Sequence, residues 1–149
     1  MRRRIALAAV AMLLTAPSLH AQEQIVDAFV AAFNAADVDG LVKLHAPDAV
    51  RLPPNQPPVR GHEALRDHFR EQLTKYAFVE LAAQQSGQYV AEAFAVSWGT
   101  YKLSVIPERG ADELVETGHW MSISSQQEES DAWLIERTIW NSDKPPPGG

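Results

Sequence analysis

Apolar residues in the first half of the chain recur at the three- and four-residue spacing of α-helices. This pattern predicts an amphipathic helix over about residues 23–36, whose apolar positions are Ile25, Val26, Phe29, Val30 and Phe33. A second, short helix is expected after Asp37, because an aspartate side chain caps a helix N-terminus well. A third helix is expected over about residues 61–73.

The residue pattern in the second half of the chain predicts β-strands. We expect four long strands, at about residues 76–85, 89–106, 113–126 and 132–142, with turns at Ser86-Gly87, Arg109-Gly110 and Glu129-Ser130-Asp131. A short strand at 49–52 precedes a stiff proline-rich loop at 53–61. Helices grouped ahead of an antiparallel meander predict an α+β fold.

The N-terminus has the features of a secretory signal peptide. Arg2, Arg3 and Arg4 precede a short apolar segment, and Ala21 provides a small residue for cleavage. The apolar segment is too short to cross a membrane. We therefore expect residues 1–21 to be removed and the protein to be periplasmic or secreted.

Charge and cysteine content exclude several classes of partner and of active site. Cleavage after Ala21 would leave 128 of the 149 residues, with ten basic and 19 acidic side chains. Such an acidic domain is unsuited to nucleic acid. The sequence contains no cysteine, which excludes disulfides, thiolate metal sites and cysteine nucleophiles.

Four segments, taken in order, resemble the nuclear-transport-factor-2-like superfamily, in its SnoaL-like and ketosteroid-isomerase-like branch. They are Asp37–Leu41, Ala46–Val50, the Pro53–Gly61 loop with Glu63-Ala64-Leu65, and Trp133–Asp143. The resemblance implies a cone-shaped barrel of three N-terminal helices packed on a curved, mainly antiparallel sheet around an apolar pocket. With the signal peptide removed, the domain is expected at residues 22–143, and the Pro/Gly-rich residues 144–149 are expected to form a disordered tail. The resemblance also implies a homodimer formed through the convex face of the sheet.

The catalytic set of the isomerases in this superfamily is absent. Alignment with them places Leu52 at the position of the catalytic base and Phe29 at that of the oxyanion-binding tyrosine. Ser122 falls near the position of the protonated carboxylic acid that, in the isomerases, stabilises the oxyanion together with the tyrosine. The resemblance therefore implies a pocket without steroid-isomerase chemistry.

Strand alternation gives one acid/base candidate. If Trp140 faces the pocket, then Thr138 and Glu136 do so too, and Glu136 would be a carboxylate on an aromatic wall. Alternatively, Glu136 is solvated or pairs with a helix residue such as Lys43. A one-residue bulge would instead turn Ile135, Arg137 and Ile139 inward.

The resulting pocket hypothesis combines aromatic, apolar and polar positions. Trp120 and Trp140 are equally compatible with core packing and with a ligand wall, and the face occupied by Trp98 is not determined. The expected pocket residues are Phe29, Phe33, Leu52, Trp98, Trp120, Ser122, Glu136, Thr138 and Trp140.

No cofactor or metal site is expected. His62 and His68 do not share a face of their helix, and no carboxylate triad accompanies the histidines. The outer face of the sheet is expected to carry His119, Met121, Ile123, Ile135 and Ile139, which favours a dimer.

Two functions stay open. The first is binding of a small hydrophobic molecule without catalysis. The second is an isomerase or cyclase-like lyase that acts on a hydrophobic carbonyl compound and uses Glu136. Neither function involves a membrane span.

Overall fold

The computed structural model describes residues 20–130 and 132–144. Most of the expected signal peptide and residues 145–149 of the expected tail lie outside these ranges. The elements in chain order are α1 (His20–Asn34), α2 (Val38–Lys43), β1 (His45–Leu52), β2 (Val59–Arg60), α3 (Gly61–Thr74), β3 (Phe78–Ala91), β4 (Phe94–Ile106), β5 (Leu114–Gln126) and β6 (Trp133–Ser142).

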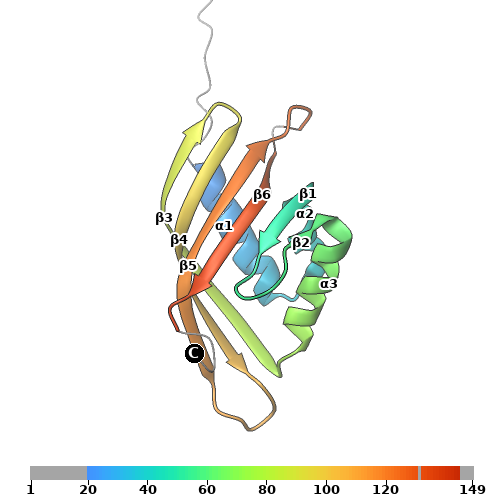
Figure 1. Ribbon diagram of the computed structural model, residues 1–149, viewed down its shortest axis with the longest axis vertical. Coiled ribbons are helices and arrows are strands. Elements are labelled where there is room, and N and C mark those ends of the chain that lie inside the picture. The colour runs from blue at the N-terminus through green and yellow to red at the C-terminus, as the bar shows by residue number, and fades with distance from the viewer. Residues whose placement is uncertain (1–19, 131, 145–149) are drawn as a thin grey trace, which may run out of the picture.

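The strands form one six-stranded sheet in the order β2-β1-β6-β5-β4-β3. All neighbours are antiparallel except β1 and β6, which run parallel. The long strands β3–β6 curve around α1, while β1 lies beside β6 and α3 lies against β1 and β2 (Figure 1). The α+β fold with a curved, mainly antiparallel sheet is therefore confirmed.

The helices are held to the sheet by a compact apolar cluster and one polar anchor. Leu41, Leu65 and Phe69 are completely buried in this cluster. At the end of α1, the Asn34 side chain donates to the Leu81 carbonyl and accepts from its amide, both at 2.8 Å. Asn34 thereby continues the hydrogen-bonding pattern of the β3 edge and fixes α1 across the sheet.

The short helix α2 begins as expected. The Asp37 carboxylate accepts a hydrogen bond from the Gly40 amide at 2.8 Å, which satisfies one of the free N–H groups of the first turn. The helix ends at Lys43. Pro47 and Asp48 lie within β1, where the register with β6 shifts between His45 and Val50.

The expected turn at Ser86-Gly87 is wrong. Both residues lie inside β3, at a register shift between Gln85 and Gly87, and the chain turns instead after Ala91. Gly87 serves packing here, because a Cβ atom at this position would lie 2.5 Å from the Trp98 ring. The actual turn has no glycine, and Glu92 adopts a positive φ of 52°.

Aromatic side chains lie over glycines in three cross-strand pairs of the sheet. The pairs are Trp98 with Gly87, Trp120 with Gly99, and Tyr101 with Gly118. A Cβ on any of these glycines would come within 2.8 Å of the ring of its partner. The glycines therefore provide the space that the three rings occupy on the neighbouring strand.

The outer face of the sheet carries Met121, Ile123 and Ile139, which are 47, 39 and 50% exposed. Trp98 pairs with Met121, and Met121 with Ile139, so an apolar row crosses three strands. Within the described ranges, no helix combines the length and apolarity that a membrane crossing requires.

Candidate functional site

A cavity lies between α1 and the inward face of the sheet. Its volume is about 130 Å³. Most of its wall is aliphatic or aromatic, from Ile25, Val26, Phe29, Phe33, Leu81, Ala83, Leu103, Trp120, Ile135 and Trp140. The polar side chains of the wall are Arg51, Gln72, Tyr101, Glu116, Ser122 and Thr138.

Six of the residues expected at the pocket line this cavity: Phe29, Phe33, Trp120, Ser122, Thr138 and Trp140. Strand register explains the sheet positions, because Trp120 pairs with Trp140, and Ser122 with Thr138. Directly paired residues share a face of the sheet. Ser122 is also tied to the next strand, since its hydroxyl lies 3.0 Å from that of Ser97.

Leu52 and Trp98 do not line the cavity, contrary to expectation. Leu52 is 36% exposed and Trp98 is 40% exposed. Their chain neighbours Arg51 and Ser97 are buried instead, as the alternation of side chains along a strand requires. On β1 the residue that faces the cavity is thus Arg51.

Glu136 also lies outside the cavity wall, because β6 bulges at this residue. Ile135 pairs with Ser124 and Arg137 pairs with Ile123, so Glu136 has no partner of its own on β5. The extra residue shifts the alternation, as a bulge does. Ile135, expected on the outer face, is consequently only 5% exposed and lines the cavity.

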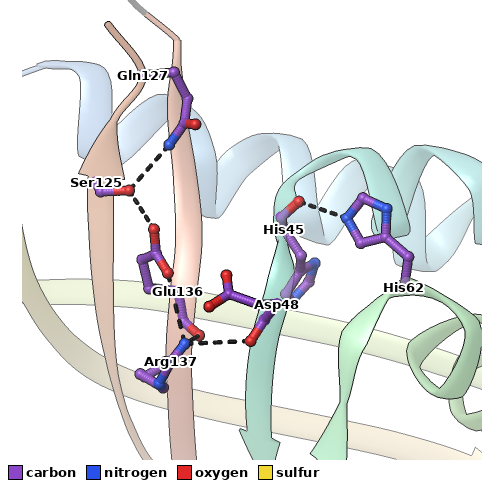
Figure 2. A network of polar contacts seen from close by, with 7 residues as sticks. All are labelled: His45, Asp48, His62, Ser125, Gln127, Glu136 and Arg137. Carbon is purple, nitrogen blue, oxygen red and sulfur yellow. Dashed lines mark hydrogen bonds and ion pairs between the residues drawn. The ribbon is translucent and has the colours of Figure 1, made fainter.

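The Glu136 carboxylate points to Ser125 (Figure 2). It accepts a short hydrogen bond from the Ser125 hydroxyl, which in turn accepts one from the Gln127 amide at 3.0 Å. Arg137 lies 3.5 Å from the other carboxylate oxygen and donates to the Asp48 carbonyl. Glu136 thus links β6 to β5 through Ser125, and it does not line the cavity.

The most unusual group in the wall is the guanidinium of Arg51. Arg51 is only 5% exposed, and its Nε and Nη1 atoms have no hydrogen-bond partner among the described residues. Its Cζ atom lies 4.5, 4.6 and 5.3 Å from the ring centroids of Phe69, Trp140 and Phe29. Burial lowers the pKa of Arg51 to about 9, so the group stays charged at neutral pH.

The aromatic contacts offset only part of the cost of burying this charge. A desolvated cation–π contact is worth about 2 kcal/mol. Burial of an unpaired ion costs several kcal/mol, and each unsatisfied donor about 1–3 kcal/mol more. No described nitrogen or oxygen atom accepts a hydrogen bond from Nε or Nη1, which leaves a strong hydrogen-bonding site in an apolar wall.

The groups next to Arg51 on the helical side are neutral. Burial, and then the charge of Arg51, lower the pKa of His68 to about 4 and that of His45 to about 3. The His45 Nδ1 atom lies 2.8 Å from the Leu41 carbonyl and therefore carries the proton. The His68 Nε2 atom and the Gln72 Oε1 atom are buried without a described partner.

A second polar group lies farther along the sheet. The Tyr101 hydroxyl donates to the Glu116 carboxylate at 2.5 Å and lies 3.2 Å from the Asn141 carbonyl. Burial, followed by the bond to Glu116, raises the pKa of Tyr101, which keeps the phenol protonated. Among the described residues that line the cavity, Glu116 is the one with a carboxylate side chain.

The sequence pattern does not reveal that Arg51 is buried, because Ala49, Val50 and Arg51 are all buried and do not alternate, and the alignment with the isomerases directed attention to Leu52. The sequence contains no signal that singles out Glu116. Within residues 20–130 and 132–144, no three His, Asp or Glu side chains are grouped so that they could hold a metal ion.

Solved structures share this fold at low sequence identity. A ketosteroid isomerase-like protein from Erwinia carotovora atroseptica superposes with a TM-score of 0.76 at 16% identity, covering 85% of this chain and 97% of the other. A nuclear transport factor 2-like superfamily protein from Salmonella enterica gives 0.74 at 15% identity, covering 90 and 98%. A protein named as a candidate scytalone dehydratase from Novosphingobium aromaticivorans gives 0.73 at 11% identity, covering 85 and 84%.

Comparison with curated protein sequences finds no match. The sequence does match the SnoaL-like domain over residues 26–125, a range that runs from α1 through most of β5 and includes Arg51 and Trp120. This match covers more than half of the chain, and the shared fold agrees with it. The chain belongs to the SnoaL-like domain family, and it shares its fold with a nuclear transport factor 2-like superfamily protein.

Proposed function

We propose that this protein binds a small, largely apolar organic molecule in the cavity between α1 and the sheet. The observation that carries the proposal is the cavity itself, with aromatic rings on several sides and few polar groups. Ligand sites are typically concave, mostly apolar and equipped with a few placed polar groups. The unpaired polar atoms at Arg51 and Gln72 meet that description.

The volume limits the size of the ligand. An apolar cavity of about 150 Å³ accommodates benzene, and the cavity here is about 130 Å³. We therefore expect a ligand whose buried portion is about one ring or a comparable alkyl chain. Larger ligands would extend from the cavity into solvent.

Binding is tested with simple ligands and intrinsic tryptophan fluorescence, since Trp120 and Trp140 both line the cavity. Phenylacetamide and hexanamide are the neutral probes. Saturable quenching with one site per chain, confirmed by calorimetry, is the expected result. If no monocyclic or short-chain probe changes the emission at millimolar concentration, the proposal is wrong.

A second candidate function is proton transfer on a carbonyl compound, as in an isomerase or lyase. It is favoured by the Glu116 carboxylate, which borders the cavity and holds the protonated Tyr101 hydroxyl at 2.5 Å. Names that contain "dehydratase" or "isomerase-like" among proteins of this fold agree with such chemistry. Deuterium exchange at the α-carbon of small ketones, followed by NMR, would reveal it. The exchange should fall about 10²–10⁴-fold in Glu116→Gln.

We further propose that the protein acts outside the cytoplasm, after cleavage behind Ala21. The three N-terminal arginines and the short apolar segment after them support this location. Mass spectrometry of the natively expressed protein should find Gln22 at the N-terminus. A main species that retains Arg2 would contradict the proposal.

We also propose that two copies associate through the outer face of the sheet. The exposed row of Trp98, Met121 and Ile139 supports this association, because contiguous apolar surface is unfavourable in water. Light scattering should give twice the mass of one chain, and Ile123→Asp should give a monomer. A wild-type monomer at micromolar concentration would contradict the proposal.

A further inference from the structure

Arg51 has no structural partner that explains its position. It extends from β1 into the cavity wall, is 5% exposed, and has two unpartnered guanidinium nitrogens. None of the ion pairs among the described residues includes it. A structural arginine at a buried site is normally paired with a carboxylate.

Three aromatic rings lie around the guanidinium of Arg51. Phe69, Trp140 and Phe29 each place a ring within 5.3 Å of the guanidinium carbon. These rings provide no nitrogen or oxygen acceptor, so the Nε and Nη1 donors keep their hydrogen-bonding capacity. A guanidinium presents its donors in a planar fork, which a carboxylate can accept with two parallel hydrogen bonds.

We infer that the cavity selects organic anions, and that Arg51 binds the carboxylate of a short apolar acid about the size of a single ring. This inference rests on the proposed binding function and specifies the class of ligand. The apolar remainder of the acid lies against Trp120 and Trp140, while the carboxylate replaces the missing partner of the guanidinium.

The neighbours of Arg51 suit an anion. His68 is close enough for the charge of Arg51 to lower its pKa, and its neutral ring brings no negative charge that would compete with an anion for Arg51. Gln72, one helical turn after His68 on α3, lines the cavity with a buried amide that lacks a partner for its oxygen. The O and N atoms of an amide are nearly indistinguishable by position, and exchanging them puts the NH₂ group at this unpartnered site, where it can donate to a carboxylate.

The one carboxylate of the described cavity wall is too distant to occupy this role. Arg51 pairs with Thr138, which pairs with Ser122 on β5. Glu116 lies six residues before Ser122 on the same strand, about 20 Å along it at 3.3 Å per residue. Its carboxylate is held by Tyr101 and leaves the guanidinium unpaired.

The test compares acids with their neutral amides: phenylacetate with phenylacetamide, and hexanoate with hexanamide. Titration calorimetry is performed on the wild type, on Arg51→Met and on Arg51→Lys. Arg66→Met is the matched control, since Arg66 also carries one positive charge but pairs with Asp39 on the surface, with a side chain that is 40% exposed.

In the wild type and in Arg66→Met, each acid should bind at least about tenfold more tightly than its amide, because a charge-assisted pair replaces an unsatisfied donor. In Arg51→Met the preference should disappear while amide binding persists. Arg51→Lys should retain part of the preference. The unliganded Arg51→Met protein should melt at the same or a higher temperature than the wild type, because it no longer buries an unpaired charge.

Equal affinity of acids and amides in the wild type would overturn the inference and leave the proposed function standing. So would an Arg51→Met protein that is folded and still prefers acids. Failure of every acid and amide to bind the wild type would overturn the proposed function, and the inference with it. The comparison within the wild type requires no variant, so it decides the matter even if Arg51→Met does not fold.

Discussion

The Trp120 ring lies close to Gly99, its direct partner across β4 and β5, and forms part of the cavity wall. A Cβ on Gly99 would lie 1.9 Å from the Gln84 carbonyl and 2.8 Å from the Trp120 ring. The position of this ring therefore depends on the absence of a side chain on the neighbouring strand.

Gly99→Ala should consequently destabilise the protein by about 2–4 kcal/mol, because the backbone contact with Gln84 cannot relax as a flexible side chain would. Urea unfolding monitored by circular dichroism measures the loss. Gly110→Ala is the control: a Cβ there meets nothing within 4 Å, and only its positive φ of 87° opposes the substitution. Equal stability of the two variants would contradict the packing argument.

Trp140→Ala should weaken ligand binding by about 1–3 kcal/mol, since it removes a large apolar contact from the cavity. The same change removes one of the three rings around the guanidinium of Arg51, whose Cζ atom lies 4.6 Å from the centroid of the Trp140 ring. Calorimetric titration with phenylacetate provides the measurement. Trp133→Ala removes an equal ring at the start of β6, outside the cavity wall, and should bind like the wild type.

Glu136→Gln should leave ligand affinity unchanged, because Glu136 contacts Ser125 and Arg137 rather than the cavity. Ser125→Ala should lower the free energy of unfolding by about 1–3 kcal/mol, because it removes a donor to a largely buried carboxylate. Chemical denaturation and the same phenylacetate titration check both statements. A loss of binding in Glu136→Gln would show that the β6 bulge is placed wrongly.

Stability should fall as the pH is lowered below about 6.5, in part because of His45. Burial lowers the folded-state pKa of this group to about 3 from the ordinary value of 6.5. Above pH 6.5 the ring is neutral in both states. Between pH 6.5 and 3 the unfolded chain binds the proton first, which costs up to about 1.4 kcal/mol per pH unit.

His45→Phe keeps a ring against Phe69 and Phe29 but cannot take up a proton. Its loss of stability between pH 7.5 and 5.0 should be smaller than that of the wild type by about 2 kcal/mol. Parallel pH dependence of the wild type and His45→Phe would refute the assignment to His45.

Periodicity predicted the elements well because the apolar positions of this chain follow the sheet and helix geometry closely. Trp120, Ser122, Thr138 and Trp140 reached the cavity wall by simple alternation. The same rule failed at Glu136, because the bulge depends on the pairing of β6 with β5 and leaves no mark in β6 alone. The turn at Ser86-Gly87 failed for a related reason: Gly87 makes room for Trp98, which pairs with it across the sheet.

Arg51 shows a different limit of sequence reasoning. A single arginine between Val50 and Leu52 has the pattern of a solvated strand position, because charged side chains are rarely buried without a partner. Its burial results from three rings contributed by α1, α3 and β6, which are far apart in the sequence. Unsatisfied buried groups of this kind become visible only when the fold brings distant elements together.

The parallel pairing of β1 with β6 also determines when the cavity can form. Arg51 lies beside Thr138, 87 residues later in the chain, and the rings of Phe29 and Phe69 are made long before that of Trp140. During translation, α1 and α3, which carry Phe29 and Phe69, are therefore synthesised before β6, which carries Trp140. The cavity is a property of the finished polypeptide, so a chain truncated before β6 would contain most of the sheet and no binding site.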